Sequence, residues 1–151
     1  MNTPADDNGP FLQLIYFSRS LVGTRPDAVA SAIWALKTRS RRFNTQAGIT
    51  GALYYSGPHF AQMLEGPREA VLLLIAAIAA DTRHTDVTIV QEEMVPVRTF
   101  GGWAMAYVDG TSEEIIRLSP RINFEHLTNE RRGPVILAMM KYLVLGDSGG
   151  P

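Results

Sequence analysis

The chain has 151 residues, is 46% hydrophobic and carries a formal net charge of −1 at pH 7. This length and hydrophobic content predict one domain with a sizeable core, and the near-neutral charge gives no general reason to expect nucleic acid or an anionic membrane as a partner. The sequence contains no cysteine, which excludes disulfides, thiolate metal sites and cysteine nucleophiles and fits a reducing compartment. Its longest apolar run, residues 70–80, is too short to span a bilayer, so we expect a cytoplasmic domain.

Hydrophobic periodicity predicts strands and helices in alternation along the chain. Residues 1–10 are polar and rich in turn formers, so we expect them to be disordered and find no secretion signal in them. Asp27 is the expected N-cap of the first helix, which Pro26 opens. The expected elements are strand 11–18, helix 26–43, strand 49–56, strand 60–66, helix 67–80, strand 87–95, strand 103–108, helix 112–118 and helix 134–145.

This order of elements predicts an α+β fold. Right-handed crossovers place the first two helices on the same face of one sheet, which gives a ferredoxin-like βαββαββ sandwich. The other face presents Phe11, Ile15, Phe17 and Met63 and needs a cover, for which the apolar helix 134–145 is the candidate. The helix 67–80 is almost wholly apolar, so we expect it to be deeply packed.

One polar residue stands out on the strand 60–66. Strand alternation puts Phe60, Gln62 and Leu64 on one face, and burying the Gln62 amide without partners would cost a few kcal/mol. The first and third strands are neighbours in a ferredoxin-like sheet, so Gln62 could form a hydrogen bond with Tyr16. Judged by residue types alone, such a phenol–amide pair is more often ordinary core packing than a functional site.

Three other patterns carry no chemistry. Residues 146–151 match the nucleophile motif of trypsin-like serine proteases, but we expect a flexible tail there, without the base, carboxylate and oxyanion hole that the reaction needs. His59, His84 and His126 lack ligand spacing, so no metal site is expected. No glycine-rich phosphate loop of the common kinds occurs.

Five ordered motifs closely resemble the BLUF (blue light using flavin) photosensor family, in its short stand-alone form. They are residues 14–18, Asn44 with residues 48–55, residues 60–66, residues 81–84 and residues 100–105. The resemblance covers residues 11–108, which we take as the flavin-binding domain. A helical extension would follow over 109–145 and a flexible tail over 146–151.

The resemblance implies a non-covalently bound flavin between the first two helices, with FAD favoured over FMN and riboflavin. Light would drive an electron and a proton from Tyr16 to the flavin and leave Gln62 rotated or tautomerised, with Trp103 or Met105 beside it. Asn44 would hold the carbonyl side of the flavin ring, and Leu36 and Ile78 would enclose the ring. The full set of implied cofactor contacts is Tyr16, Leu36, Ser40, Asn44, Gln62, Ile78, Asp81, Arg83 and His84.

Several of these residues also have ordinary structural explanations. Asn44 could be a helix C-cap, Arg83 could pair with Asp81, and His84 could be a satisfied structural residue. The basic run over residues 37–42 could bind a cofactor phosphate or could be a solvated helix face. Only geometry separates these alternatives.

The leading hypothesis is a blue-light receptor without catalytic activity of its own. Its signal would leave through the fifth strand and the C-terminal helices to a partner protein, and a homo-oligomer is expected. We expect no direct contact with nucleic acid or membrane. The alternatives are a non-photoactive interaction domain of the same fold, the sensor part of a larger light-regulated enzyme such as a cyclase or phosphodiesterase, and a flavin-dependent or hydrolytic enzyme.

Overall fold

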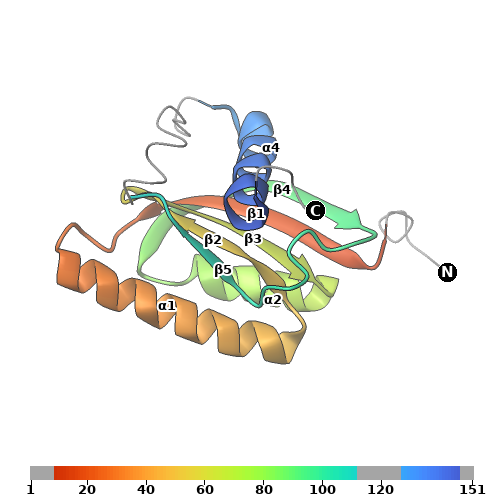
Figure 1. Ribbon diagram of the computed structural model, residues 1–151, viewed down its shortest axis with the longest axis horizontal. Helices are drawn as coiled ribbons and strands as arrows, with labels where there is room; N and C mark the ends of the chain where they lie inside the picture. Colours follow the sequence, from red (N-terminus) through yellow and green to blue (C-terminus); the bar gives the residue numbers. More distant parts are fainter. Residues whose placement is uncertain (1–8, 112–126, 147–151) are drawn as a thin grey trace.

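A computed structural model describes residues 9–111 and 127–146, which form a five-stranded sheet with helices on both faces (Figure 1). Helices α1 and α2 lie against one face of the sheet, and α4 lies against the other. The predicted helix 112–118 and most of the predicted disordered segment and tail lie outside the described residues. The elements are β1 (Phe11–Ser20), α1 (Pro26–Ala47), β2 (Thr50–Tyr55), β3 (His59–Gly66), α2 (Arg68–Ala79), β4 (His84–Val95), β5 (Ala106–Asp109), α4 (Asn129–Met140) and the π-helical turn η3 (Lys141–Leu145).

The strand order across the sheet is β4-β1-β3-β2-β5. Strand β1 pairs antiparallel with β3 and β4, β2 pairs antiparallel with β3, and β5 joins the edge of β2 in parallel. The first four strands and two helices therefore have the ferredoxin-like arrangement, and the predicted fold class is confirmed. The topology places Tyr16 directly opposite Gln62 on the two central strands.

Each face of the sheet buries its own hydrophobic cluster. Leu12, Leu14 and Leu64 pack on the side of α1 and α2, whereas Ile15 and Met63 pack on the side of α4. This division follows the alternation of strand side chains. The prediction that the C-terminal helix covers the second face is confirmed, with these helix residues buried in that cluster: Ile136, Met139 and Met140.

The bounds of α1 differ from the prediction. Asp27 is not the N-cap, because Arg25 occupies that position and Asp27 lies within the first turn. The helix continues to Ala47 and ends at Gly48, whose φ of 72° is the left-handed conformation that glycine adopts readily. Asn44 is therefore a buried residue inside the helix and not its C-cap.

Helix α2 and strand β5 also correct the sequence prediction. Only Val71 and Ile75 of α2 are buried and Leu73 is 72% exposed, because the helix packs on the sheet with one side only. Strand β5 begins at Ala106, not at Trp103. The Trp103 amide donates to the Phe100 carbonyl at 3.0 Å, so this residue closes a turn and lies outside the ladder.

No helix in the described part of the chain is long and apolar enough to cross a membrane.

Candidate functional site

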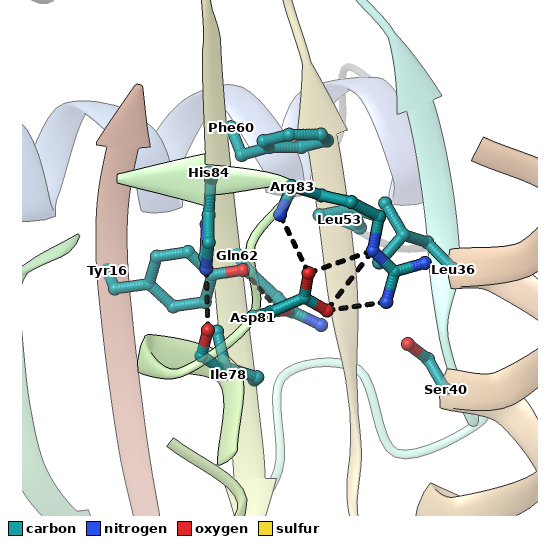
Figure 2. A pocket seen from close by; sticks show the side chains of 10 residues that line it. All are labelled: Tyr16, Leu36, Ser40, Leu53, Phe60, Gln62, Ile78, Asp81, Arg83 and His84. Carbon is teal, nitrogen blue, oxygen red and sulfur yellow. Dashed lines mark hydrogen bonds and ion pairs between the residues drawn. The ribbon is translucent and has the colours of Figure 1, made fainter. Parts of the chain in front are cut away.

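A pocket lies between the sheet and helices α1 and α2 (Figure 2). Its volume, counted together with the open solvent at its mouth, is about 380 Å³. A larger groove between α1 and α2 continues from it and adds Arg39 and Phe43 to the shared walls. Residues from six elements and the α2–β4 connection line the pocket: Tyr16, Leu36, Ser40, Leu53, Phe60, Gln62, Ile78, Asp81, Arg83 and His84.

The central contact in the pocket joins the two buried residues Tyr16 and Gln62. The Tyr16 hydroxyl donates to Gln62 Oε1 at 2.6 Å, which confirms the predicted pair. Burial, with a smaller contribution from the Asp81 carboxylate, raises the pKa of Tyr16 well above its ordinary value. The phenol therefore keeps its proton at physiological pH and can donate it.

The other end of the Gln62 amide meets a weak acceptor. Gln62 Nε2 donates to the thioether Sδ of Met105 at 3.4 Å, and a thioether is a poorer acceptor than a carbonyl. Met105 is 2% exposed, whereas Trp103 is 45% exposed. Of the two candidates that the sequence left open, Met105 is the one brought to Gln62, and Trp103 lies at the surface.

Asn44 carries a buried acceptor without a partner. Its Nδ2 donates to the Ala104 carbonyl at 2.9 Å, but within the described residues its Oδ1 has no hydrogen-bond partner. Leaving such an atom unpaired costs about 1–3 kcal/mol. Asn44 does not line the pocket itself, but it follows Leu36 and Ser40 at helical spacing on the same stripe of α1.

A flavin fits this donor set. The unpaired Asn44 Oδ1 can accept an N–H from a heterocycle, Leu36 and Ile78 offer apolar side chains for a ring, and Arg39 supplies positive charge along the groove.

Asp81 and Arg83 form an ion pair at one side of the pocket, which Figure 2 shows. Arg83 Nε donates to Asp81 Oδ1 at 2.9 Å, and Arg83 Nη2 donates to Oδ2. The hydrogen bonds from Arg83 lower the pKa of Asp81 to about 2. The predicted ion pair between Arg83 and Asp81 is therefore confirmed, and both of its residues also line the pocket.

His84 is held by two hydrogen bonds. Its Nε2 lies 2.6 Å from the Ile78 carbonyl, which can only accept, so Nε2 carries the hydrogen. In the neutral ring Nδ1 then accepts the Ser18 hydroxyl at 2.8 Å. The ring meets the Tyr16 ring edge to face at 5.9 Å, and His84 thus joins β1 to the end of α2 while lining the pocket.

The pocket brings together the predicted contacts from Tyr16 to His84, with Asn44 one helical turn beyond Ser40. Sequence reasoning missed Leu53 and Phe60. Strand alternation could have found Phe60, which shares a face with Gln62, and the register of the predicted hairpin could have found Leu53, which pairs with Gln62 across the sheet.

Comparison with known proteins identifies this arrangement. The family model for BLUF, described as sensors of blue-light using FAD, matches residues 11–106. The chain is 35% identical over 85 residues to the blue light- and temperature-regulated antirepressor BluF of Escherichia coli (strain K12), which covers 56% of this chain and 21% of that protein. It is 35% identical over 108 residues to photoactivated adenylate cyclase subunit beta of Euglena gracilis, which covers 71% of this chain and 12% of that protein.

Solved structures give the same result. The dark-state structure of BlrB, a BLUF protein, matches with a TM-score of 0.71 and 31% identity over 87% of this chain and 96% of that chain. The photo-activated state of BlsA matches with a TM-score of 0.70 and 26% identity over 84% of this chain and 91% of that chain. The chain spans about a fifth or less of the curated relatives named above. With the family matched over residues 11–106 and the pocket at its centre, this chain belongs to the BLUF family and is a flavin-binding blue-light sensor domain.

Proposed function

We propose that Tyr16 and Gln62 are the residues through which this sensor responds to blue light. The observation that carries the proposal is the 2.6 Å hydrogen bond between the Tyr16 hydroxyl and Gln62 Oε1 in the wall of the pocket. Gln62 is the only link between Tyr16 and Met105 that the hydrogen bonds among the described residues provide. A change in the orientation of this amide therefore changes both contacts at once.

The roles of the two side chains follow from their chemistry. A bound flavin supplies blue-light absorption and, once excited, the oxidising power of the site. Tyr16 is the electron donor, and its raised pKa means that its proton leaves only when the phenol is oxidised. Gln62 Oε1 accepts that proton while Gln62 Nε2 would release one toward the bound flavin, so the amide passes the proton on and can change tautomer or rotate. When electron and proton return to Tyr16, the residues have undergone no net redox change and Gln62 keeps a new set of hydrogen-bond partners.

The pocket supports FAD as the cofactor, with FMN and riboflavin as the alternatives. Leu36 and Ile78 would contact the ring, and Asn44 Oδ1 would accept one of its N–H groups. The groove between α1 and α2 would hold the rest of the cofactor beside Arg39 and Arg83. Because the sequence contains no cysteine, a flavin–cysteinyl adduct is excluded for this chain.

Two substitutions test the proposal. Purified wild-type protein should be yellow and should show a reversible red shift of flavin absorption after blue light. Tyr16→Phe and Gln62→Leu should bind flavin but lose the shift, because each removes one partner of the central hydrogen bond. Tyr142→Phe and Gln46→Leu change exposed residues of the same types and should photocycle normally. A wild-type protein that stays colourless with flavin supplied, or normal shifts in both pocket variants, would refute the proposal.

We also propose that the signal passes from Met105 into β5 and on to the C-terminal helix and a partner protein. Met105 directly precedes β5, and β5 contacts η3. A homo-oligomer and a cytoplasmic location remain predictions. Relatives in which the domain is a small part of a longer chain favour a second possibility, the sensor part of a larger light-regulated protein, whereas the near-complete match to BlrB favours a short receptor.

A further inference from the structure

Glu65 is a fully buried carboxylate that takes no part in the photochemistry proposed above. It lies near the end of β3, on the face opposite Gln62, and is 0% exposed. Its Oε2 accepts the Thr99 amide at 2.7 Å, and its Oε1 accepts the Phe100 amide at 2.8 Å. Charge-assisted hydrogen bonds of this kind are the strong ones. Glu65 therefore anchors the first half of the β4–β5 loop, residues 96–105.

Further hydrogen bonds connect the second half of the β4–β5 loop with that anchor. The fully buried Phe100 accepts the Trp103 amide at 3.0 Å, which closes the turn around two glycines. Trp103 in turn accepts the Gly51 amide at 3.1 Å. Side chains of α1 then hold the Ala104 and Met105 carbonyls, at 2.9 Å and 3.3 Å. An unbroken series of contacts thus leads from Glu65 to the methionine that touches Gln62.

Arg98 has a different task in the same loop. Its guanidinium donates to the Gly48 carbonyl at 2.8 Å, to the Glu65 carbonyl at 3.2 Å and to the Thr50 hydroxyl at 3.0 Å. These hydrogen bonds go to backbone and hydroxyl oxygens, and within the described residues none of them goes to the Glu65 carboxylate. The carboxylate accepts its hydrogen bonds from the two loop amides and from one side-chain amide.

That side-chain amide connects Glu65 with the opposite edge of the sheet. Gln13 Nε2 donates to Glu65 Oε2 at 3.2 Å, and Gln91 Nε2 donates to Gln13 Oε1 at 2.6 Å. Gln91 lies under α4 at Gly133, where an added Cβ would come within 3.2 Å of the Gln91 side chain. Glu65 therefore joins the β4–β5 loop to the strand on which α4 rests.

We infer that Glu65 is a positioning residue for the photoreaction. Its carboxylate holds the first half of the β4–β5 loop and thereby fixes the position of Met105 against Gln62. Through Gln13 and Gln91 it also connects this loop to β4, the strand on which α4 packs. The inference rests on the proposed role of Gln62.

The test compares Glu65→Gln with Glu92→Gln in the flavin-loaded full chain. Glu65→Gln keeps the shape of the side chain but replaces one acceptor oxygen by a donor NH₂, which opposes a loop amide. Glu92 is exposed on β4 and undergoes the same chemical change. In the dark, hydrogen exchange at Thr99 and Phe100 should quicken at least tenfold in Glu65→Gln, and exchange over 103–105 at least threefold. Lit-state recovery should quicken at least fivefold because the loop is held less firmly, and both rates should stay within twofold in Glu92→Gln.

The outcomes separate this inference from the proposed function. Unchanged exchange over 103–105, or recovery within twofold of wild type or slower, would show that Glu65 only packs in the core. If no variant and no wild-type protein shows a red shift, the proposed function fails, and dark exchange over 103–105 still decides whether Glu65 positions that segment. If Glu65→Gln does not fold, Gln13→Met removes one donor to the carboxylate and must produce a smaller change of the same sign.

Discussion

At the scale of single residues, two buried polar side chains of β3 serve different sites on opposite faces of the sheet. Gln62 and Glu65 are three positions apart and therefore point to opposite sides. Gln62 meets the pocket, and Glu65 meets the β4–β5 loop above the other face. Each is buried, and each is matched by hydrogen bonds from residues distant in sequence.

The ion pair of Asp81 and Arg83 gives the fold a pH dependence. Arg83 lowers the pKa of Asp81 from its ordinary value of 3.8 to about 2, so the pair stabilises the fold above about pH 4 and this stability is lost as the pH falls toward 2. Asp81→Asn should thus lower the free energy of unfolding by about 2 kcal/mol at pH 6, and the gap to wild type should close between pH 4 and 2. Urea unfolding across this range measures it.

The control for this prediction is Asp86→Asn, which removes a pair with Arg19 whose side chains are 60% and 69% exposed. Asparagine accepts the positive φ of this position. Exposed pairs contribute less than about 1 kcal/mol, so this variant should lose little stability. A gap between Asp81→Asn and wild type that stays constant down to pH 2 would contradict the assignment.

At the scale of elements, α4 is seated on β4 through a glycine. A Cβ at Gly133 would lie 2.8 Å from the Val90 carbonyl oxygen. This oxygen belongs to the backbone of β4 and cannot relieve the clash by a change of rotamer. In Gly133→Ala, overpacking of about 1–3 kcal/mol should exceed the helix-propensity gain of at most about 1 kcal/mol. The variant should therefore unfold at lower denaturant concentration than wild type. Gly102→Ala, at a position with no atoms within 4 Å of a Cβ, should not, and equal stability of both variants would show that α4 sits further from the sheet.

Element faces could be predicted from the sequence better than element ends. Alternation predicts the correct faces for β1 and β3, and together with the ferredoxin-like strand order it predicts the Tyr16–Gln62 pair. The continuous apolar run of α2 carries no information on which side is buried, so the exposure of Leu73 was missed. The alternation of side chains from Trp103 onward is typical of a strand, but Trp103 closes a turn by its hydrogen bond to Phe100. This backbone hydrogen bond cannot be predicted from the pattern of side chains.

The site was predictable only in part for the same physical reason. Phe60 shares a strand face with Gln62 and follows from alternation, whereas Leu53 also needed the register that pairs it with Gln62. The role of Glu65 depends on the backbone amides of Thr99 and Phe100. Every residue except proline has a backbone N–H, so a pattern of side chains does not predict which of them a carboxylate will bind.

At the scale of the whole molecule, the sheet lies between α1 and α2 on one side and α4 on the other (Figure 1). The cofactor pocket is on the side of α1 and α2. Ligand binding to the folded state alone raises stability by about 2.7 kcal/mol at a hundredfold excess over Kd, which corresponds to a rise in Tm of about 5–10 °C at this chain size. Thermal melts with added FAD or FMN should show that rise. Asn44→Ala should reduce it, and Gln46→Ala, an exposed change on the same helix, should not.

ADP is the comparison ligand for these melts, since it lacks the flavin ring. If ADP raised the Tm as much as FAD does, the pocket would be recognising the nucleotide tail and not the ring. An absent rise with both flavins would contradict the fit of the pocket.

The surface position of Trp103 gives the protein an optical reporter of its own. The chain has two tryptophans, Trp34 on the outside of α1 at 69% exposure and Trp103 in the β4–β5 loop at 45%. A Trp34→Phe chain would retain a single indole, two residues before Met105. The wavelength of its emission would follow how much water reaches that segment, so the loop could be observed in dark and illuminated protein without attaching a dye.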